Sequence, residues 1–364
     1  MACELVSKGV QDVYLTGNPE VSFFKQNYKR HTNFAMREFQ LNPLGSLTTN
    51  SQITLKIPNK GDLLGHIWID LGLGTVTSSN AFSNACGISA DSESSPAIFE
   101  LYIGGQFVDR QDAFFMAQHW QKYLSDSSAK GDAIYGTSGA VTSGVKSWKF
   151  ANWMPLHFFF CDSVYLPLIA LQYHEVEVRI TFSPDDSASL LSKLKFYANY
   201  IVLDTDERSA FVNTDHELLV EQVQRITANG NKFDLSLLNH PVKSLHWGIA
   251  SADGFYTDNV QLYLNGTEIY GVLMPDKFFN QVQGYYNSEA SSPLLRNSES
   301  SLKMLSFALK ACKHQPCGTC NFSRIDSAVL SMSSVSGGTL NFLHAVNFNI
   351  LRIKKGMAGL AFSN

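Results

Sequence analysis

Charged residues are scarce in this sequence. Asp, Glu, Lys and Arg make up 16% of the 364 residues, against about 25% in a typical soluble domain. The formal net charge is −4 and the isoelectric point about 6.2. A protein that coats nucleic acid needs clustered Lys and Arg to neutralise phosphates, so we expect no direct nucleic-acid binding. A soluble chain with so few charges is expected to cover much of its exterior with subunit contacts.

Cysteine frameworks, leader peptides and long apolar runs are also missing. The six cysteines have no framework spacing, which favours reduced thiols in a cytosol-like compartment. The first residues lack the basic-then-apolar layout of a signal peptide. No apolar run reaches about 18 residues, and the nearest one, residues 158–171, is interrupted by Asp162 and Pro167. We therefore expect a chain that is neither secreted by that route nor membrane-spanning.

Motifs of catalysis are equally hard to find. There is no Gly-x-Ser-x-Gly elbow, and residues 139–146 resemble a phosphate loop only in outline, because Lys146 does not follow the second glycine directly. His174 and Glu175 lack the second histidine of a metalloprotease helix and lie in a strand pattern. We predict no catalytic, cofactor-binding or metal-binding residues, no cofactor and no enzymatic activity.

One cysteine cluster has metal-like spacing. A structural zinc site could use Cys312 or His314 together with Cys317 and Cys320. Such sites usually take two ligand pairs from separate segments, and no second Cys pair exists elsewhere. A simple turn between strands is the interpretation we prefer.

Two asparagines match the glycosylation acceptor pattern, Asn265 and Asn321. Without a signal peptide they would not meet the secretory enzymes, and Asn265 is explained by a hairpin turn. We expect both to be unmodified, although the sequence does not decide whether either carries a glycan.

A repeated stretch organises the chain. Residues 99–108 (FELYIGGQFV) are echoed by residues 260–269 (VQLYLNGTEI), and each copy is typical of a β-hairpin with a two-residue turn that tolerates positive φ. An aromatic segment follows each hairpin, opening at Asp112 or Asp276, where the carboxylate could cap a helix. These segments close near Tyr123 and Tyr286. The repeat, about 160 residues apart, predicts two copies of one β-domain.

Short alternating segments continue through both halves. We expect strands in residues 53–57, 67–71, 155–160, 174–182, 194–203, 216–224, 242–249, 302–309, 322–332 and 340–351. Short strands separated by turns indicate antiparallel sandwiches or barrels. The predicted organisation is an N-terminal arm (1–35), a first domain (36–205), a polar linker (206–215) and a second domain (216–364). Residues 125–144 and 287–301 are predicted surface loops.

The arm is expected to contain a helix over residues 18–30, with Asn18 as its cap and Pro19 at its first position. Lys25, Lys29 and Arg30 would give it a basic face. Such a helix could contact an acidic partner or a membrane surface, or could simply pack on its own domain.

Several segments together resemble the major capsid proteins of the nucleocytoplasmic large DNA viruses. The matching segments, which follow the family order across nearly the whole chain, are residues 9–19 (GVQDVYLTGNP), 22–25 (SFFK), 28–35 (YKRHTNFA), 155–161 (PLHFFFC), 166–176 (LPLIALQYHEV), 204–208 (DTDER), 216–217 (HE), 315–326 (QPCGTCNFSRID) and 349–362 (NILRIKKGMAGLAF).

The resemblance implies an all-β double jelly roll of two tandem eight-stranded sandwiches with short helices in the loops. It implies a structural virion protein that forms homotrimeric, pseudo-hexagonal capsomers in an icosahedral capsid over an internal membrane, assembled in the host cytoplasm. The implied partners are neighbouring capsomers and minor capsid proteins, with a peripheral contact of the arm to the membrane. We expect the arm on the inner side and the two long loops facing outward or toward neighbouring subunits.

Alternatives remain at this point. The chain is shorter than many members of the family, which leaves open a minor capsid paralogue or a scaffold protein. A jelly-roll carbohydrate-binding protein or enzyme is a further alternative, since that fold also hosts sugar chemistry. That alternative requires an exposed aromatic platform or a carboxylate pair in a cleft.

Overall fold

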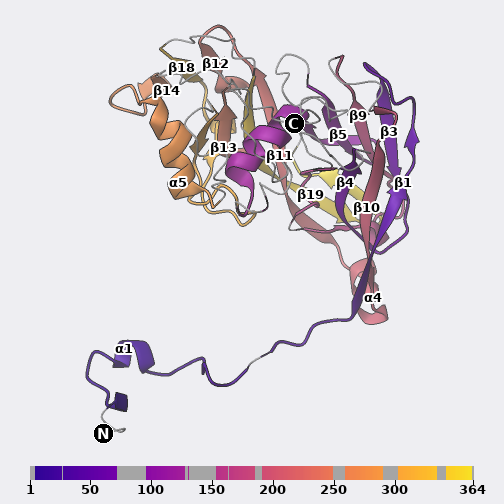
Figure 1. Cartoon of the computed structure of the whole chain (residues 1–364), viewed down its shortest axis with the longest axis horizontal. Coiled ribbons are helices and arrows are strands. Elements are labelled where there is room, and N and C mark those ends of the chain that lie inside the picture. The colour runs from indigo at the N-terminus through magenta and orange to yellow at the C-terminus, as the bar shows by residue number, and fades with distance from the viewer. Residues whose placement is uncertain are drawn as a thin grey trace, which may run out of the picture. The chain divides into compact units, whose positions relative to one another are not determined.

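The computed structural model describes residues 5–26, 28–71, 96–127, 130, 153–162, 164–184, 191–248, 259–289, 302–333 and 342–362. The chain divides into two units, residues 1–33 and residues 34–364. Figure 1 shows the strands and helices of the larger unit and labels many of them. No helix in the described ranges combines the length and the apolar character needed to cross a membrane.

The smaller unit contains one short helix, α1 (Val13–Thr16), and its described residues are exposed. The predicted helix over residues 18–30 is wrong, because the described part of that segment contains no helix. Gly17 and Asn18 follow the end of α1, and Asn18 has a positive φ of 49°. Gly and Asn just after a helix, with Pro beyond them, form a stop signal. The prediction of a helix start fails here because the same residue types also begin helices.

The first half of the larger unit is a sandwich of two antiparallel sheets. One sheet has the order β1 (Phe34–Leu41), β10 (Lys195–Leu203), β4 (Leu63–Asp70) and β7 (Trp153–Pro155), and β8 (Leu166–Pro167) also pairs with β4. The other has the order β2 (Pro43–Leu44), β3 (Gln52–Ile57), β9 (Val176–Thr181), β5 (Ile98–Ile103) and β6 (Gln106–Asp112).

The second half is built in the same way. One sheet has the order β11 (His216–Thr227), β19 (Phe342–Lys354), β13 (Pro241–Trp247) and β16 (Lys303–Ser306), with β17 (Cys320–Asn321) on β13 and β20 (Met357–Leu360) on β19. The other has the order β12 (Lys232–Asp234), β18 (Ala328–Met332), β14 (Val260–Leu264) and β15 (Thr267–Glu268).

The two strand orders correspond position by position. In each half the first and last long strands pair (β1 with β10, β11 with β19), and the hairpin stands at the edge of the opposite sheet. Strand β10 also pairs with β4, as β19 does with β13. This is the arrangement of a jelly roll. The protein is a double jelly roll, as predicted. The proposed boundaries at residues 205, 206 and 216 remain a proposal, and helix α4 (Thr205–Asn213), which we had not predicted, occupies the segment assigned to the linker.

The repeated hairpins are confirmed. Gly104 and Gly105 have φ values of 58° and 78°, and Asn265 and Gly266 have values of 50° and 77°. Positive φ at both central residues lets the turn twist with its strands. A Cβ on Gly104 would also overlap the ring of His174, so this turn requires glycine for two reasons.

Two strand predictions need correction. The segment 155–160 is not a strand beyond Pro155, although Phe158, Phe159 and Phe160 are buried as expected. Consecutive buried aromatics can fill a core from a turn, so an apolar run alone does not distinguish the two cases. The segment 322–332 begins with a 3₁₀ turn, η7 (Phe322–Arg324), and becomes a strand at Ala328.

A helix follows each hairpin, as predicted. The first, η3 (Phe115–Leu124), begins at Asp112, whose Oδ1 accepts from the Phe115 N–H at 2.7 Å. The second consists of η6 (Phe278–Val282) and α5 (Gln283–Asn287). Asp276 opens this second helix, and its carboxylate pairs with Lys303 Nζ at 2.8 Å, while its capping role remains a prediction. Two further 3₁₀ turns are η4 (Leu168–Ala170) and η5 (Leu235–Leu237).

The cores of the two halves are not independent. One buried cluster fills the first jelly roll and continues into the second through Leu302, Met304, Val346 and Leu351. The other cluster fills the interior of the second jelly roll around Trp247. The junction between the jelly rolls is therefore packed as a core.

Candidate functional site at the junction of the two jelly rolls

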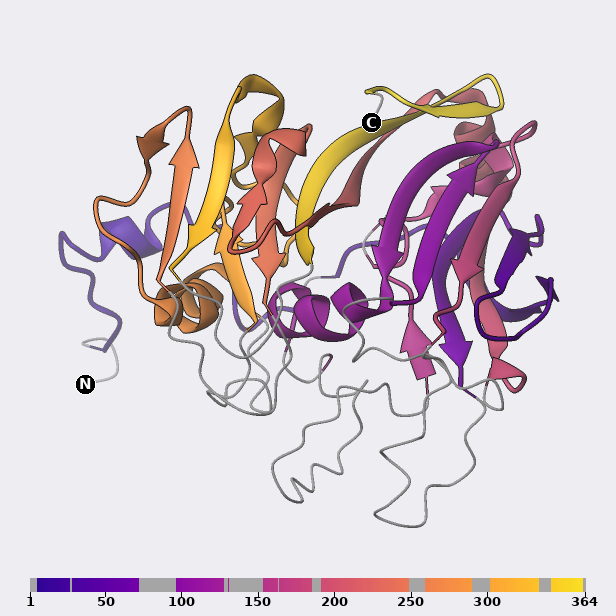
Figure 2. The same cartoon turned by 90° about the horizontal axis from the view of Figure 1, so that it is seen from above.

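Helix η3 lies between the two jelly rolls. Figure 2 shows it, in magenta, between the strands of the first half and those of the second. All of its residues except Trp120 are buried. A helix that is buried on nearly all sides must be covered by more than one layer, and here the second jelly roll supplies the additional cover.

Asp112 joins the two halves at the start of this helix. Its Oδ2 accepts from His344 Nε2 of β19 at 2.7 Å and pairs with Arg225 Nη1 of β11 at 3.4 Å, while its Oδ1 caps η3. Burial works to raise the pKa of Asp112, but His344, the Phe115 N–H and Arg225 together hold it below its ordinary value. Asp112 is therefore a buried carboxylate whose partners come from both jelly rolls.

Strands β6 and β11 meet beside Asp112. Asp109 Oδ1 accepts from the Val223 N–H at 2.8 Å, and Gln222 Nε2 donates to the Val108 carbonyl. Burial raises the pKa of Asp109 to about 6, although the hydrogen bonds from Val223 and Gln111 work in the opposite direction. Side chains of each strand thus satisfy backbone groups of the other, which fixes how the two edges meet.

Three histidine rings gather around the middle of η3. The ring of His119 lies 5.7 Å from the ring of His246 in β13 and 5.7 Å from that of His344. Neither ring nitrogen of His119 has a hydrogen-bond partner in the described part of the chain. Burial, and the charges that His246, His344 and Lys122 can carry, hold the pKa of His119 well below its usual range. Burial also lowers the pKa of His246, to about 3, so His119 and His246 are neutral packing groups at neutral pH.

A pocket of about 380 Å³ opens beside this polar cluster. Its walls come from β6, β11, the segment before β13, and His344 of β19, and they include Asp109, Arg110 and Arg225. Asp112 and His344 pair with each other, and Arg225 pairs with Asp112, so most of the charge that lines the pocket is already matched.

The cysteine cluster is a turn in the described structure. Cys317 Sγ contacts the backbone N–H and carbonyl of Lys310, and His314 Nδ1 lies 3.5 Å from Glu221 Oε1. Glu221 also pairs with the buried Lys243 at 2.6 Å. Among the residues that the structure describes, no group of three or more His, Cys, Asp or Glu side chains is arranged to hold a metal ion.

The other motifs singled out in the sequence have structural roles. Asn265 Oδ1 accepts from the backbone N–H groups of Asp326 and Ser327, and Asn321 Oδ1 accepts from the Ser323 N–H. His174 Nδ1 accepts from the Ala358 N–H at 3.0 Å. The segment 139–146 lies outside the described residues.

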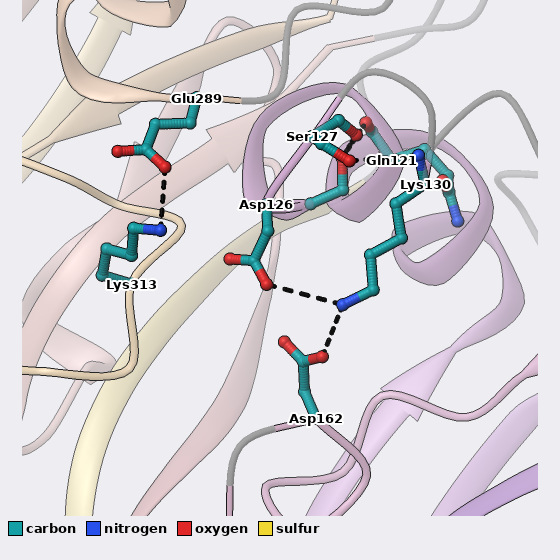
Figure 3. Close-up of polar contacts among 8 residues, drawn as sticks. Gln121, Asp126, Ser127, Lys130, Asp162, Glu289 and Lys313 are labelled. Carbon is teal, nitrogen blue, oxygen red and sulfur yellow. Dashed lines mark hydrogen bonds and ion pairs between the residues drawn. The ribbon is translucent and has the colours of Figure 1, made fainter. Parts of the chain in front are cut away.

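The predicted long loops are described only where they begin. Lys130 Nζ pairs with Asp162 at 2.6 Å and with Asp126 at 3.5 Å, and Lys313 pairs with Glu289 at 2.8 Å (Figure 3). Residues 131–144 and 290–301 lie outside the described part, so the orientation of both loops remains a prediction.

The two post-hairpin helices differ in burial. In η3 all residues except Trp120 are buried, whereas Tyr285 and Tyr286 of α5 are 77% and 66% exposed and Val282 of η6 is 40% exposed. Helices in equivalent positions of two similar domains thus have different surroundings. The helix of the first half has a jelly roll against it, whereas none of the described residues forms a second layer over the outer face of the second helix.

The outer faces of the sheets that these helices could cover also differ in exposure. All residues of β13 after Pro241 are buried, because its outer face lies under η3. In β4, the counterpart of β13, the outer-face residues His66, Trp68 and Asp70 stay partly or fully exposed. Trp68 stacks on Tyr197 of β10 with ring centroids 4.4 Å apart, and Trp153 of β7 adjoins them on the same face. The first jelly roll therefore presents an aromatic platform.

Sequence reasoning did not find the junction residues. Asp112 was predicted only as a cap, and His119, His246 and His344 were not selected, because their proximity depends on contacts between residues more than 100 positions apart. The first hairpin and its helix were the one signal that pointed to this region.

Comparisons with known proteins give a consistent result. A family model described as major capsid protein N-terminus matches residues 22–214, and one described as large eukaryotic DNA virus major capsid protein matches residues 254–359. The chain is 36% identical to the major capsid protein of Pyramimonas orientalis virus, with 99% of this chain and 98% of that protein covered. It is 29% identical to the major capsid protein of Paramecium bursaria Chlorella virus 1, with 99% of each covered.

Solved structures agree. The VP54 protein of the same Chlorella virus, PBCV-1, in a crystal structure fitted into a reconstruction of the virophage Sputnik, matches with a TM-score of 0.72 and 26% identity over 94% of this chain and 100% of that chain. The Faustovirus major capsid protein has a TM-score of 0.61 and 12% identity, with 96% of this chain and 95% of that chain covered, and shares the fold.

Proposed function

This chain belongs to the family of large eukaryotic DNA virus major capsid proteins, and we propose that three copies close into a pseudo-hexagonal capsomer of the virion's outer shell. Its place is the capsid of the virion. The proposed role is structural rather than enzymatic. The capsomer would tile an icosahedral shell over an internal membrane, beside minor capsid proteins.

The observation that carries the trimer is the unequal burial of equivalent helices. Within one chain, η3 fills the space between the first and second jelly rolls. In a ring of three chains, the second jelly roll of each chain would meet the first jelly roll of the next. The same kind of junction would then occur six times, three times within chains and three times between them.

The surfaces available for the junction between chains are complementary in character. The outer face of the second helix offers Val282, Tyr285 and Tyr286. The platform of Trp68, Tyr197 and Trp153 lies on the first jelly roll. It corresponds in position to His246 and His344 of the second jelly roll, which η3 covers. Aromatic residues bury much area at modest entropic cost, which suits obligate contacts of about 2,000 Å² or more.

Light scattering after size exclusion tests the trimer. The purified protein should have three times the mass of the chain, and Tyr286→Glu, which places a charge in the proposed contact, should give a monomer. Tyr173→Glu is the matched control, because Tyr173 is 74% exposed and lies in the loop before β9, away from the platform sheet. A wild-type monomer, or a Tyr286→Glu trimer as stable as wild type, would contradict the proposal.

The aromatic platform also meets the requirement of the carbohydrate-binding alternative. The two functions predict different behaviour of the same surface. A trimer would bury Trp68 and Trp153, so their fluorescence should not change when sugars are added. A lectin would be a monomer whose tryptophan fluorescence changes when a glycan that it binds on a glycan array is added.

The N-terminal unit supports a role on the inner side of the shell. Apolar residues such as Phe23 and Phe24 are exposed there beside Lys25, Lys29 and Arg30. Apolar groups next to basic ones suit a peripheral contact with an anionic membrane. Full-length protein should sediment with vesicles containing about 30% phosphatidylserine, and a variant with all three basic residues changed to Ser should not. Equal sedimentation of both would exclude this contact.

A further inference from the structure

Lys122 and Asn280 bring an amine and a side-chain amide together between the two jelly rolls. Lys122 is on η3 and Asn280 on η6, and Lys122 Nζ lies 3.3 Å from Asn280 Oδ1. The carbonyl carbon of Asn280 is one bond beyond that oxygen. The two residues are 158 positions apart in the chain.

The surroundings hold both groups in place. Lys122 Nζ also donates to the Leu302 carbonyl at 3.2 Å, and Tyr123 Oη donates to the carbonyls of Leu302 and Asn280. The helices approach closely at Gly284, where a Cβ would lie 3.2 Å from the Tyr123 ring. Lys122 is only 7% exposed. A reacting pair held in contact gains an effective concentration far above that of free reactants.

The amine is also suited to act as a nucleophile. Burial lowers the pKa of Lys122 to about 7, against the opposing effect of Asp276. A large share of Lys122 is therefore neutral at physiological pH, and only the neutral amine attacks a carbonyl carbon. Asp276, which pairs with Lys303 Nζ at 2.8 Å, is a nearby carboxylate that can accept and return protons.

We propose that Lys122 and Asn280 form an intramolecular isopeptide bond that joins the first jelly roll covalently to the second. Asp276 takes a proton from the Lys122 ammonium, and the Nζ lone pair attacks Cγ of Asn280. The bond between Cγ and Nδ2 then breaks, and the amide nitrogen leaves with a further Nζ proton as ammonia. The ammonia takes the proton held by Asp276, so the products are the new amide, one ammonium ion and the original carboxylate.

Such a bond would have a mechanical role. It would tie two sandwiches whose junction is otherwise held by packing, hydrogen bonds and ion pairs, and it would join the buried end of η3 to the partly buried Asn280 of η6. The inference does not depend on the trimer, because both residues belong to one chain and meet in its own core.

Intact-mass spectrometry of the purified full-length protein under denaturing conditions tests the bond. Its formation removes one ammonia, so the mass should be about 17 Da below the mass of the same chain without the bond. After digestion, the peptide with Lys122 should be joined to the peptide with Asn280. Separate, unmodified peptides at these two sites in natively purified protein would overturn the proposal.

Variants identify the atoms involved. Lys122→Met should show no loss of ammonia. Asn280→Asp should lose water instead of ammonia, a loss of about 18 Da, and should give a product with the same mass as linked wild type. Lys303→Met should still show the ammonia loss, since the Lys303 side chain pairs with Asp276 and is neither of the two reacting groups. A linkage found between Lys303 and Asp276 in place of Lys122 and Asn280 would refute the assignment.

A time course keeps the test independent of the folding of any variant. Wild-type protein that is produced in an unfolded state should begin without the linkage. After refolding it should acquire the linkage, once the fold has formed. A linkage already present in never-folded chains, or absent after complete refolding, would contradict a reaction that depends on the folded site.

Discussion

Trp68 of β4 and His246 of β13 occupy the same position in the two jelly rolls, yet Trp68 is partly exposed and His246 is fully buried. Trp68 pairs across the sheet with Tyr197, as His246 does with His344. The difference lies in the cover, because η3 lies over His246 and no element of this chain's described part lies over Trp68. The residue types match their surroundings, since a large aromatic residue suits a surface that awaits a partner.

Replacing Trp68 by Ala should weaken the trimer more than the fold. Central aromatic residues of interfaces commonly contribute about 2 kcal/mol or more, so the dissociation constant should rise by at least about 30-fold for each contact. Because Trp68 is partly exposed in the single chain, the unfolding midpoint of the monomer should change little. Mass photometry across a dilution series measures the first effect and urea unfolding the second.

The control for Trp68→Ala is Tyr173→Ala, an exposed aromatic residue away from the platform sheet. It should leave the trimer unchanged. A Trp68→Ala protein that dissociates at the wild-type concentration would exclude the platform from the contact.

The histidine cluster should make the fold sensitive to acid. Burial lowers the pKa of His246 from 6.5 to about 3, and that of His119 lies well below 6.5 as well. The unfolded chain binds these protons first, so stability is complete above about pH 6.5 and falls as the pH decreases toward the folded pKa. The expected loss is about 1.4 kcal/mol per pH unit for each histidine that stays neutral in the folded state.

His119→Phe isolates one of these histidines. Since neither ring nitrogen of His119 has a partner in the described part of the chain, an apolar ring of similar size should be tolerated at neutral pH. Between about pH 6.5 and about pH 5 the variant should lose about 1.4 kcal/mol less per pH unit than wild type. Urea unfolding at several pH values gives both slopes, and equal slopes would show that His119 is protonated in the folded state.

Some features of the fold follow directly from local sequence. Gly104–Gly105 and Asn265–Gly266 predict tight hairpins because these residues adopt positive φ easily, and the structure confirms both turns. Local signals give a wrong prediction where the same residue types are common at both helix starts and helix ends. Asn18 and Pro19 can end one helix or begin another, and only the chain before them decides.

The junction could not be predicted in the same way. Asp112 and His344 are 232 positions apart, and the local sequence around each residue does not indicate its partner. The pairing follows from how two jelly rolls pack, which depends on the buried surface of η3 as a whole. Repetition in the sequence predicts two similar domains, but it does not predict which of two equivalent helices is covered.

Asp109→Asn should stabilise the protein at alkaline pH and have little effect in acid. Burial raises the pKa of Asp109 from 3.8 to about 6, so the charged form is disfavoured in the folded state. The stabilisation that Asp109 gives the folded wild-type protein is therefore present below about pH 4. It is lost as the pH rises through about 6, and the total loss is about 3 kcal/mol. Asn at this site avoids that loss.

The hydrogen bonds of Asp109 can survive this substitution. Asn Oδ1 can accept from the Val223 N–H, and Gln111 can turn its amide to accept from Asn Nδ2, although it then gives up the bond that its Nε2 donates to the His157 carbonyl. Thermal unfolding of both proteins at about pH 8 and about pH 4 checks the prediction. A gain of the same size at both pH values would exclude a charge effect.

Asp112→Ala should be among the most damaging single substitutions in the chain. It removes the cap of η3 and leaves His344 and Arg225 without their shared carboxylate inside the junction. Losing one partner of a buried charged network commonly costs about 3–5 kcal/mol. Asp204→Ala removes an equivalent but exposed cap, that of α4, and should cost about 1 kcal/mol. Guanidinium unfolding of the two variants compares a cap that joins two domains with one that serves only its own helix, and similar losses would mean that Asp112 holds its helix and nothing more.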